Sequence, residues 1–241
     1  MRRALRPAIE SMEGRPLPST PHPLTASGLV HLVVCDGNSL TFGASLSIPG
    51  TATPANYPAQ LQSDLGPSWE VINHGIPGQT IEQMIASEQT TFAALPFPRW
   101  AFHRPNDKPI DIVWEGTNSI ALNHDSGEEA SELLARYVAE RHARGFKVIV
   151  LTCLPADNPT LWPEFEAQRE IYNALIRANR VGADAVVDVA SDPRLSDPDS
   201  PYFGPDHVHL DDAGYGVVAS LVATALEHPS LPALRTPTRL R

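Results

Sequence analysis

Five short apolar runs, spread along most of the chain, constrain its fold more than any other feature. They are rich in valine and isoleucine and continuously apolar, as in the strands of a parallel sheet that is covered on both faces. The runs cover residues 30–35, 70–73, 110–115, 147–153 and 185–189. The sequence therefore predicts five buried strands.

Helical patterns lie between these runs. They cover residues 54–65, 80–86, 126–144 and 162–180, and a last one starts near Asp211 or Asp212 and stops before Pro229. Thr80 is predicted to cap its helix, because Glu82 and Gln83 follow it. Alternating strands and helices favour right-handed βαβ units. The predicted fold class is α/β, a three-layer α/β/α sandwich around a parallel sheet.

The length of 241 residues is enough for one such domain. We assign residues 29–228 to it, with no internal repeat or linker. Residues 1–28 hold many prolines and are expected to form an extended or poorly ordered arm. Residues 229–241 hold three prolines and three arginines and are expected to hug the surface or be disordered.

The formal net charge of −10 argues against two classes of partner. An acidic surface repels nucleic-acid phosphates and anionic membranes. No run approaches the roughly 20 apolar residues of a membrane helix. Charged residues and prolines interrupt the segment after Met1, so no signal peptide is recognised and a cytoplasmic location is expected. The oligomeric state is left open.

Two cysteines, Cys35 and Cys153, end apolar runs. The pattern predicts two buried free thiols, with a structural disulfide as the alternative. A catalytic cysteine is disfavoured because a serine suits that role better.

That serine is Ser39, in the loop that leaves the first run. Sites in parallel α/β sheets form beyond the carboxyl ends of the strands. Gly37 permits a sharp exit there, and the N–H of Ser39 can face a developing oxyanion. The loop is no nucleophile elbow of the G-x-S-x-G type, since Thr41 replaces the second glycine. Taken alone, Ser39 is more typical of an ordinary turn serine.

A nucleophilic serine needs a base, and the base needs an orienting acid. Asp206 lies three residues before His209, a spacing that lets its carboxylate reach Nδ1 and leaves Nε2 for the serine. His207 is the competing base, but its side chain diverges from the adjacent aspartate. A solvated turn, or a metal shared by the two histidines, is the alternative, although no third ligand cluster is evident.

Two further residues are candidate oxyanion donors. Gly78 lies just before a predicted helix, where a backbone N–H is unpaired, and Asn118 follows the third run with its amide available. Each alone is more typical of an ordinary turn. Their weight comes from converging with Ser39 and His209 at one sheet edge.

In chain order these blocks resemble one family. The order is a Gly-x-Ser-Leu-Thr loop, Asn-x-Gly-x-x-Gly-x-Thr, Gly-x-Asn, and Asp-x-x-His-Leu-x-x-x-Gly-Tyr. It is similar to the SGNH, or GDSL-like, hydrolases (esterases and lipases), which are named for four residues that are Ser39, Gly78, Asn118 and His209 here. The Thr-x-x-Pro stretch from Thr152 also fits the family.

The resemblance implies a flavodoxin-like sheet of order 2-1-3-4-5 and ester hydrolysis through an acyl-enzyme, without metal or organic cofactor. It implies a catalytic triad of Ser39, His209 and Asp206, and an oxyanion hole of Ser39, Gly78 and Asn118. One departure is that Asn38 stands where the family usually has aspartate. Asp36 is a candidate for supplying the missing charge.

The expected partner is a small ester with a short-chain, aryl or acetyl group, because no long hydrophobic lid is evident. Four aromatic residues near the loops are candidates to contact it, or belong to the core: Trp114, Trp162, Tyr202 and Phe203. Alternatives on the same fold are a carbohydrate O-deacetylase, an O-acetyltransferase, a thioesterase or lysophospholipase, and a non-catalytic binding module. A flavodoxin-like electron carrier is disfavoured, since the first loop lacks residues to cradle a flavin phosphate.

Overall fold

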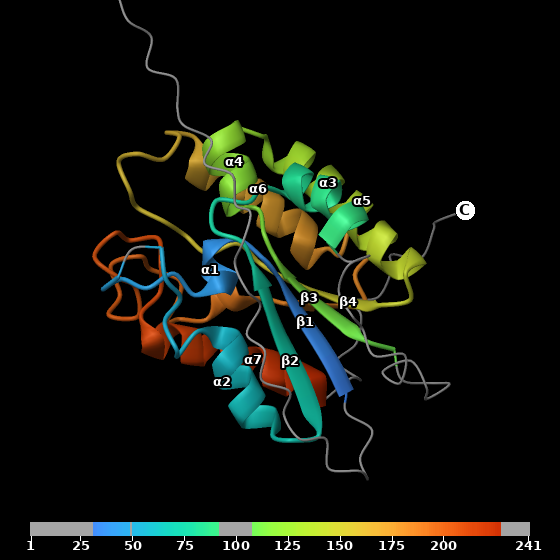
Figure 1. Ribbon diagram of the computed structural model, residues 1–241. Coiled ribbons are helices and arrows are strands. Elements are labelled where there is room, and N and C mark those ends of the chain that lie inside the picture. The colour runs from blue at the N-terminus through green and yellow to red at the C-terminus, as the bar shows by residue number, and fades with distance from the viewer. Residues whose placement is uncertain (1–30, 49, 92–107, 228–241) are drawn as a thin grey trace, which may run out of the picture.

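The protein was analysed as a computed structural model, which describes residues 31–48, 50–91 and 108–227. The predicted N-terminal arm and C-terminal tail lie outside these ranges. Five parallel strands form one sheet in the order β2-β1-β3-β4-β5, which confirms the predicted fold class and strand order (Figure 1). The strands are β1 His31–Gly37, β2 Trp69–Gly75, β3 Ile110–Trp114, β4 Lys147–Leu151 and β5 Ala185–Val187.

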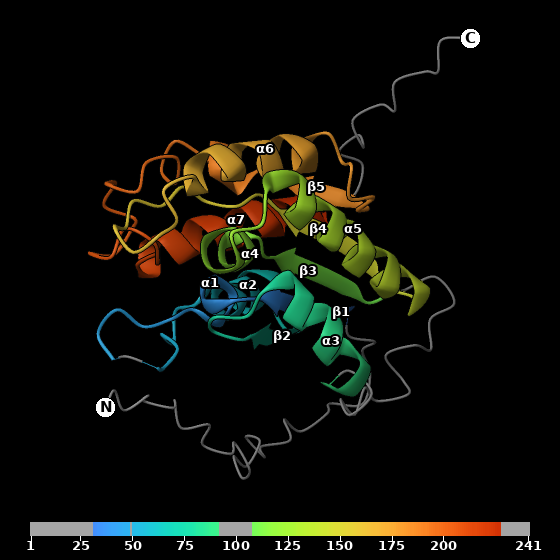
Figure 2. The ribbon, with the colours of Figure 1, turned by 90° about the horizontal axis from the view of Figure 1, so that it is seen from above.

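Helices cover both faces of the sheet. They are α1 Ser39–Phe42, α2 Tyr57–Leu65, α3 Ile81–Thr91, α4 Thr117–Asn123, α5 Gly127–Ala143, α6 Phe165–Arg177 and α7 Asp212–Glu227, with a 3-10 turn at Val189–Ser191. One layer holds α2 and α7, and the other holds α3, α4, α5 and α6 (Figures 1 and 2). The three layers explain why the strands are apolar on both faces.

The core consists of two main clusters, one on each side of the sheet. In β3, Ile112 and Trp114 join the cluster under α2 and α7, whereas Val113 joins the cluster under the other helices. In β4, Ile149 and Val150 divide in the same way. Successive side chains of a strand point to opposite faces, so a strand buried on both faces must be apolar throughout.

Helix starts show the expected caps. The Thr80 N–H donates to the Gln83 side chain at 3.1 Å, and the Thr80 hydroxyl accepts from the Gln83 N–H at 3.5 Å, as the sequence predicted. Ser126 and Glu129 form a reciprocal capping box at the start of α5. Within the described ranges, no helix is long and apolar enough to cross a membrane.

The boundaries differ from the prediction in two places near the site. Asn118 was expected in a loop, but it lies in the first turn of α4, a helix that the sequence analysis missed. This helix is short and its N-cap, Gly116, has no side chain, so the usual capping signal is absent. In addition, α6 begins at Phe165 and not at Trp162.

Candidate active site

Ser39 lies at the first position of α1, directly beyond the carboxyl end of β1. Gly37 makes this exit with a φ of 151°, and an added Cβ would lie only 2.2 Å from the carbonyl oxygen of Trp114. The Asn38 side chain caps the short helix by accepting the N–H of Leu40 at 2.9 Å. The tight glycine and the cap together hold the serine in place at the edge of the sheet.

His209 and Asp206 come from the segment before α7 and meet the serine. The Nε2 of His209 lies 2.8 Å from the Oγ of Ser39, and its Nδ1 lies 2.6 Å from the Asp206 carboxylate. The other Asp206 oxygen accepts the backbone N–H groups of Val208 and His209 at 3.1 and 3.0 Å. With Nδ1–H donating to Asp206, Nε2 is free to accept the serine proton.

The charge of Asp206 suits that arrangement. Burial acts to raise the pKa of Asp206, but hydrogen bonds from the His209 ring and from two backbone N–H groups outweigh it. The pKa of Asp206 therefore lies below its usual value. The carboxylate is ionised at neutral pH and can stabilise a protonated His209.

The competing histidine, His207, faces elsewhere. Its backbone is left-handed, with a φ of 54°, and its Nδ1 lies 2.9 Å from the Asp199 carboxylate. His207 therefore contacts Asp199, and, among the described residues, His209 is the histidine that contacts Ser39. In the described part of the chain, no group of three or more histidine, cysteine, aspartate or glutamate residues is arranged to hold a metal ion.

The two predicted oxyanion donors lie in the turn before α3, which holds Gly78, and in the first turn of α4, which holds Asn118. The Nδ2 of Asn118 donates to the carbonyl oxygen of Gln79 at 2.8 Å, which joins the start of α4 to the Gly78 turn. The same turn is tied to β1, since the Ile76 N–H donates to the Gly37 carbonyl at 2.9 Å. Gly78 has a φ of 79° and therefore adopts a turn that favours glycine.

Asn118 supplies a prediction. If its second amide hydrogen faces the oxyanion, Asn118→Ala lowers kcat by roughly 10² to 10³ with little change in KM, because the donor acts on charge that develops only in the transition state. Steady-state kinetics on a p-nitrophenyl ester measure this. Asn123→Ala, at the exposed far end of α4, is the matched control. Equal rates for both variants would contradict the assignment.

Asp36 does not supply a charge to the nucleophile loop in the way the sequence suggested. Its carboxylate contacts the His74 Nδ1 at 2.5 Å and accepts the hydroxyl of Tyr137 at 2.7 Å. Those partners lie on β2 and α5.

Both cysteines, Cys35 and Cys153, are buried free thiols, as the sequence predicted. Burial raises the pKa of Cys153 to about 12, so this thiol is protonated at neutral pH. A thiolate nucleophile is therefore disfavoured.

The aromatic candidates divide between core and surface. Trp114 is 1% exposed and donates its indole N–H to the Thr152 carbonyl, so it belongs to the core, and Phe203 is buried as well. Trp162 is half-buried and stacks on the exposed ring of His124, with ring centroids 5.1 Å apart. Trp162 and the half-buried Tyr202 are therefore the two that remain open to a ligand.

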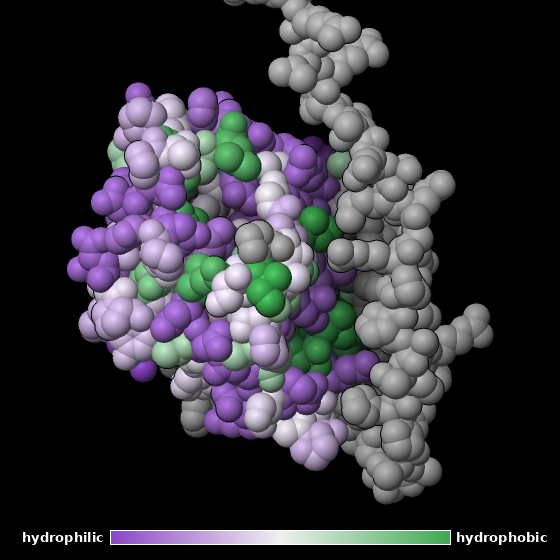
Figure 3. Space-filling view, turned by 60° about the vertical axis from the view of Figure 1, so that its left-hand side comes forward, coloured by the Kyte–Doolittle hydropathy of each residue, from purple (hydrophilic) through white to green (hydrophobic). Residues whose placement is uncertain are grey.

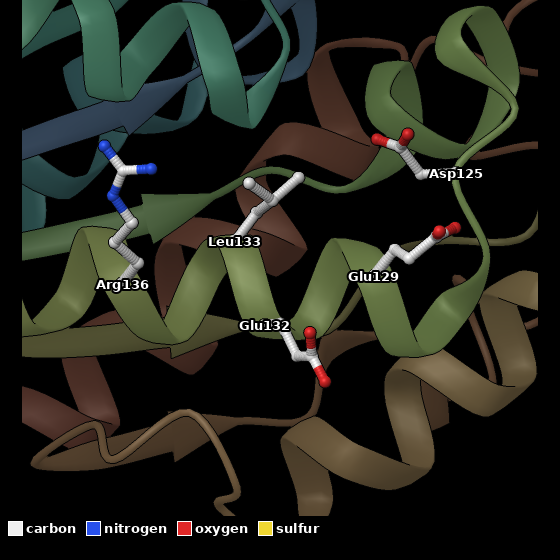
Figure 4. Close-up of a pocket in the computed structure, with 5 residues that line it drawn as sticks. All are labelled: Asp125, Glu129, Glu132, Leu133 and Arg136. Carbon is white, nitrogen blue, oxygen red and sulfur yellow. The ribbon is translucent and has the colours of Figure 1, made fainter.

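A separate hollow lies on α5. It is lined by Asp125, Glu129, Glu132, Leu133 and Arg136, none of which belongs to the loops around Ser39 (Figure 4). Burial and the nearby Glu82 carboxylate raise the pKa of Asp125 to about 6. Three acidic side chains and one guanidinium line the hollow. We assign it no part in the Ser39 site.

Comparisons with known proteins agree with this fold, and a family model identifies the class of protein. The family model "GDSL-like Lipase/Acylhydrolase family" matches residues 35–217. The chain belongs to this family, as the sequence resemblance predicted. No match was found among curated proteins.

Several solved structures share the fold. A carbohydrate acetylesterase family member from Sinorhizobium meliloti is 19% identical, with a TM-score of 0.61 over 83% of this chain and 99% of that one. The aryl esterase of M. smegmatis is 18% identical, with a TM-score of 0.61 over 82% and 99%. An α/β hydrolase, LAE5, from the metagenome of Lake Arreo is 24% identical, with a TM-score of 0.59 over 83% and 97%.

Proposed function

We propose that the protein hydrolyses short-chain, aryl or acetyl esters of small molecules through an acyl-enzyme on Ser39. The observation that carries the proposal is the continuous contact from the Ser39 Oγ to His209 and on to Asp206, at 2.8 and 2.6 Å. This contact provides a nucleophile, a base and an orienting carboxylate in one line.

In the first step the Ser39 oxygen attacks the ester carbonyl carbon while His209 takes the serine proton. The carbonyl oxygen becomes an oxyanion and is held by the N–H groups of Ser39 and Gly78 and by the Asn118 amide. His209 then gives its proton to the departing alcohol as the ester bond breaks, which leaves the acyl group on Ser39. His209 then deprotonates a water molecule, whose oxygen attacks the acyl carbon. The bond from that carbon to the Ser39 oxygen breaks, His209 returns the proton to the serine, and the carboxylic acid is released.

The surface around the loops suits a small ester of mixed polarity. Three large apolar side chains in the loops after β1 and β2 are exposed: Leu46, Ile48 and Ile76. Figure 3 looks onto the side that carries these loops and shows separate hydrophobic patches on a mainly hydrophilic face. Such patches contact a short acyl or aryl group, whereas a long acyl chain requires a continuous apolar surface.

An acetylated carbohydrate is a second candidate substrate. Two of the solved structures that share the fold are described as carbohydrate acetylesterases. The stacked pair of His124 and Trp162 adds a flat, partly exposed aromatic surface of the kind that packs against a sugar ring. Acetylated xylose and p-nitrophenyl acetate, compared at equal concentration, separate the two candidates.

Covalent labelling tests the proposal directly. A fluorophosphonate is expected to modify the folded protein once, on the peptide that contains Ser39, and Ser39→Ala is expected to lose both the label and the esterase activity. Ser45→Ala, in the following loop, is the matched control and keeps both. Labelling of Ser39 without turnover of any ester or transfer to an added alcohol would favour a binding module.

A further inference from the structure

Asn38 and Glu115 are neighbours at the carboxyl edge of the sheet. Gly37 of β1 pairs with Trp114 of β3, so the next residue on each strand is Asn38 on one side and Glu115 on the other. Both side chains are buried, with 1% and 2% of their surface exposed. A glutamate in such a place is unusual, because a buried carboxyl group is costly unless it has partners.

In each of the two side chains, one of the two polar atoms has a hydrogen-bond partner. The Oδ1 of Asn38 accepts the Leu40 N–H at 2.9 Å, so its Nδ2 points the other way. The Oε1 of Glu115 accepts the Gly116 N–H at 3.1 Å. The remaining Nδ2 and Oε2 are buried, and among the described residues neither has a hydrogen bond of ordinary geometry. A buried donor and a buried acceptor side by side complement each other.

The donors around Glu115 converge on its carboxyl group. Burial raises its pKa to about 8, while the Gly116 N–H, the Asn38 amide and the Asn118 N–H all act to lower it. These three donors belong to the nucleophile loop and to the start of α4. The carboxyl group therefore stands between the loop of Ser39 and the helix of Asn118.

The backbone beneath Glu115 is held firmly. The hydroxyl of Tyr172 donates to the Glu115 carbonyl at 2.8 Å. Gly116 has a φ of 126°, and an added Cβ would lie 2.6 Å from the Tyr172 ring. The carboxyl group thus projects from a fixed point, which is what a side chain needs in order to position two loops.

We propose that Glu115 is a positioning residue, which accepts the Asn38 amide and thereby holds the Ser39 loop and the Asn118 helix in register. In this chain an amide stands where the family usually has an aspartate, and the carboxyl group comes from the end of the neighbouring strand. The inference rests on the proposed ester hydrolysis for its kinetic readout only.

An exchange experiment tests the pair. In Glu115→Gln one of the two acceptor oxygens becomes an NH₂ group, so the side chain can no longer accept both the Gly116 N–H and the Asn38 amide, and kcat is expected to fall roughly tenfold with little change in KM. Asn38→Asp sets two buried carboxyl groups together and lowers kcat further, by about 10². The double variant restores an acid facing an amide and is expected to return kcat to within about threefold of wild type. Such recovery is the mark of a direct contact. Glu70→Gln, exposed on β2, is the control and keeps wild-type kinetics.

The pH profile is a second readout. Among the described residues, the ionisable groups that interact with Glu115 are Glu82, Cys153 and Tyr172. The pKa values of Cys153 and Tyr172 are raised, by burial above all, so both are neutral near pH 8. Ionisation of Glu115 therefore puts a new negative charge at the start of α4, the helix that carries the proposed oxyanion donor Asn118. In wild type, kcat is expected to fall as the pH rises through about 8. In Glu115→Gln this fall is absent.

Thermal melts separate failure of this inference from failure of the proposed function, because they need no substrate. The folded-state pKa of Glu115 lies above the usual 4.5, so the folded protein keeps a proton that the unfolded chain has lost. The stabilisation is full below about 4.5 and is lost as the pH rises to about 8. The Tm of wild type should therefore fall across this window more than that of Glu115→Gln. Recovery of Tm in the exchanged double variant supports the contact. If the double variant is no better than Asn38→Asp in both Tm and kcat, the pairing is wrong.

Discussion

His209→Ala is expected to lower kcat/KM for p-nitrophenyl acetate by on the order of 10⁴ or more while the protein stays folded. The imidazole takes the proton of Ser39 in the first step and supplies the same function to water in the second. Its Nε2 lies 2.8 Å from the serine oxygen, and the described structure places no other histidine against that atom. Steady-state kinetics and a circular dichroism spectrum measure the two parts of the prediction.

His207→Ala is the matched control for this variant. His207 has the same side chain as His209 and lies two residues before it in the chain. It contacts Asp199 instead of Ser39. Its removal should change kcat/KM by less than about threefold, the change expected from loss of an exposed ion pair. A loss as large as that of His209→Ala would show that the wrong histidine has been assigned as the base.

Arg141→Met is expected to destabilise the protein by about 3 to 5 kcal/mol, the cost of breaking a buried ion pair. Arg141 and Asp111 are both fully buried, and the Nε of the guanidinium contacts the aspartate at 2.5 Å. The guanidinium also lies over the Phe146 ring, 3.8 Å from its centroid. Burial and the nearby Asp36 hold the pKa of Asp111 well above its usual value, although Arg141 acts to lower it. Without Arg141 the aspartate loses its only nearby cation in the described core.

Urea unfolding monitored by tryptophan fluorescence measures this change. Arg136→Met is the control, since Arg136 is exposed and, among the described residues, forms an ion pair with Glu140 one turn further along α5. Arg136→Met should lower the free energy of unfolding by no more than about 0.5 kcal/mol. Replacing Asp111 by valine as well as Arg141 by methionine removes the stranded carboxyl group and should recover part of the loss. Equal stabilities for Arg141→Met and Arg136→Met would contradict the buried ion pair.

The strands and the longer helices could be predicted from the sequence because their signals are local. Continuous valine-rich runs identify strands that are buried on both faces, and the Thr80 cap marks the start of α3. The short α4 could not be found in this way. It lasts seven residues and starts at a glycine without a capping side chain, so the packing of Tyr172 and Ser119, not local propensity, holds it in place.

In the candidate site, too, some features could be predicted from local sequence signals and others could not. The identities of Ser39, Asp206 and His209 follow from the chain, because the spacing of Asp206 and His209 is local and the serine follows a predicted strand. Their roles in catalysis remain predictions until the variants are measured. What local spacing could not predict is the distance from His209 to Ser39, which spans 170 residues of chain.

The sequence by itself determined that this chain forms a doubly covered parallel sheet and which residues come to its carboxyl edge, since both depend on periodicity and on loops that leave strand ends. Only the tertiary structure decided which of those residues meet. The register of β1 on β3 puts Glu115 beside Asn38, and the fold brings His207 to Asp199 and His209 to Ser39. Contacts of this kind depend on the packing of elements far apart in the chain, which no local pattern encodes.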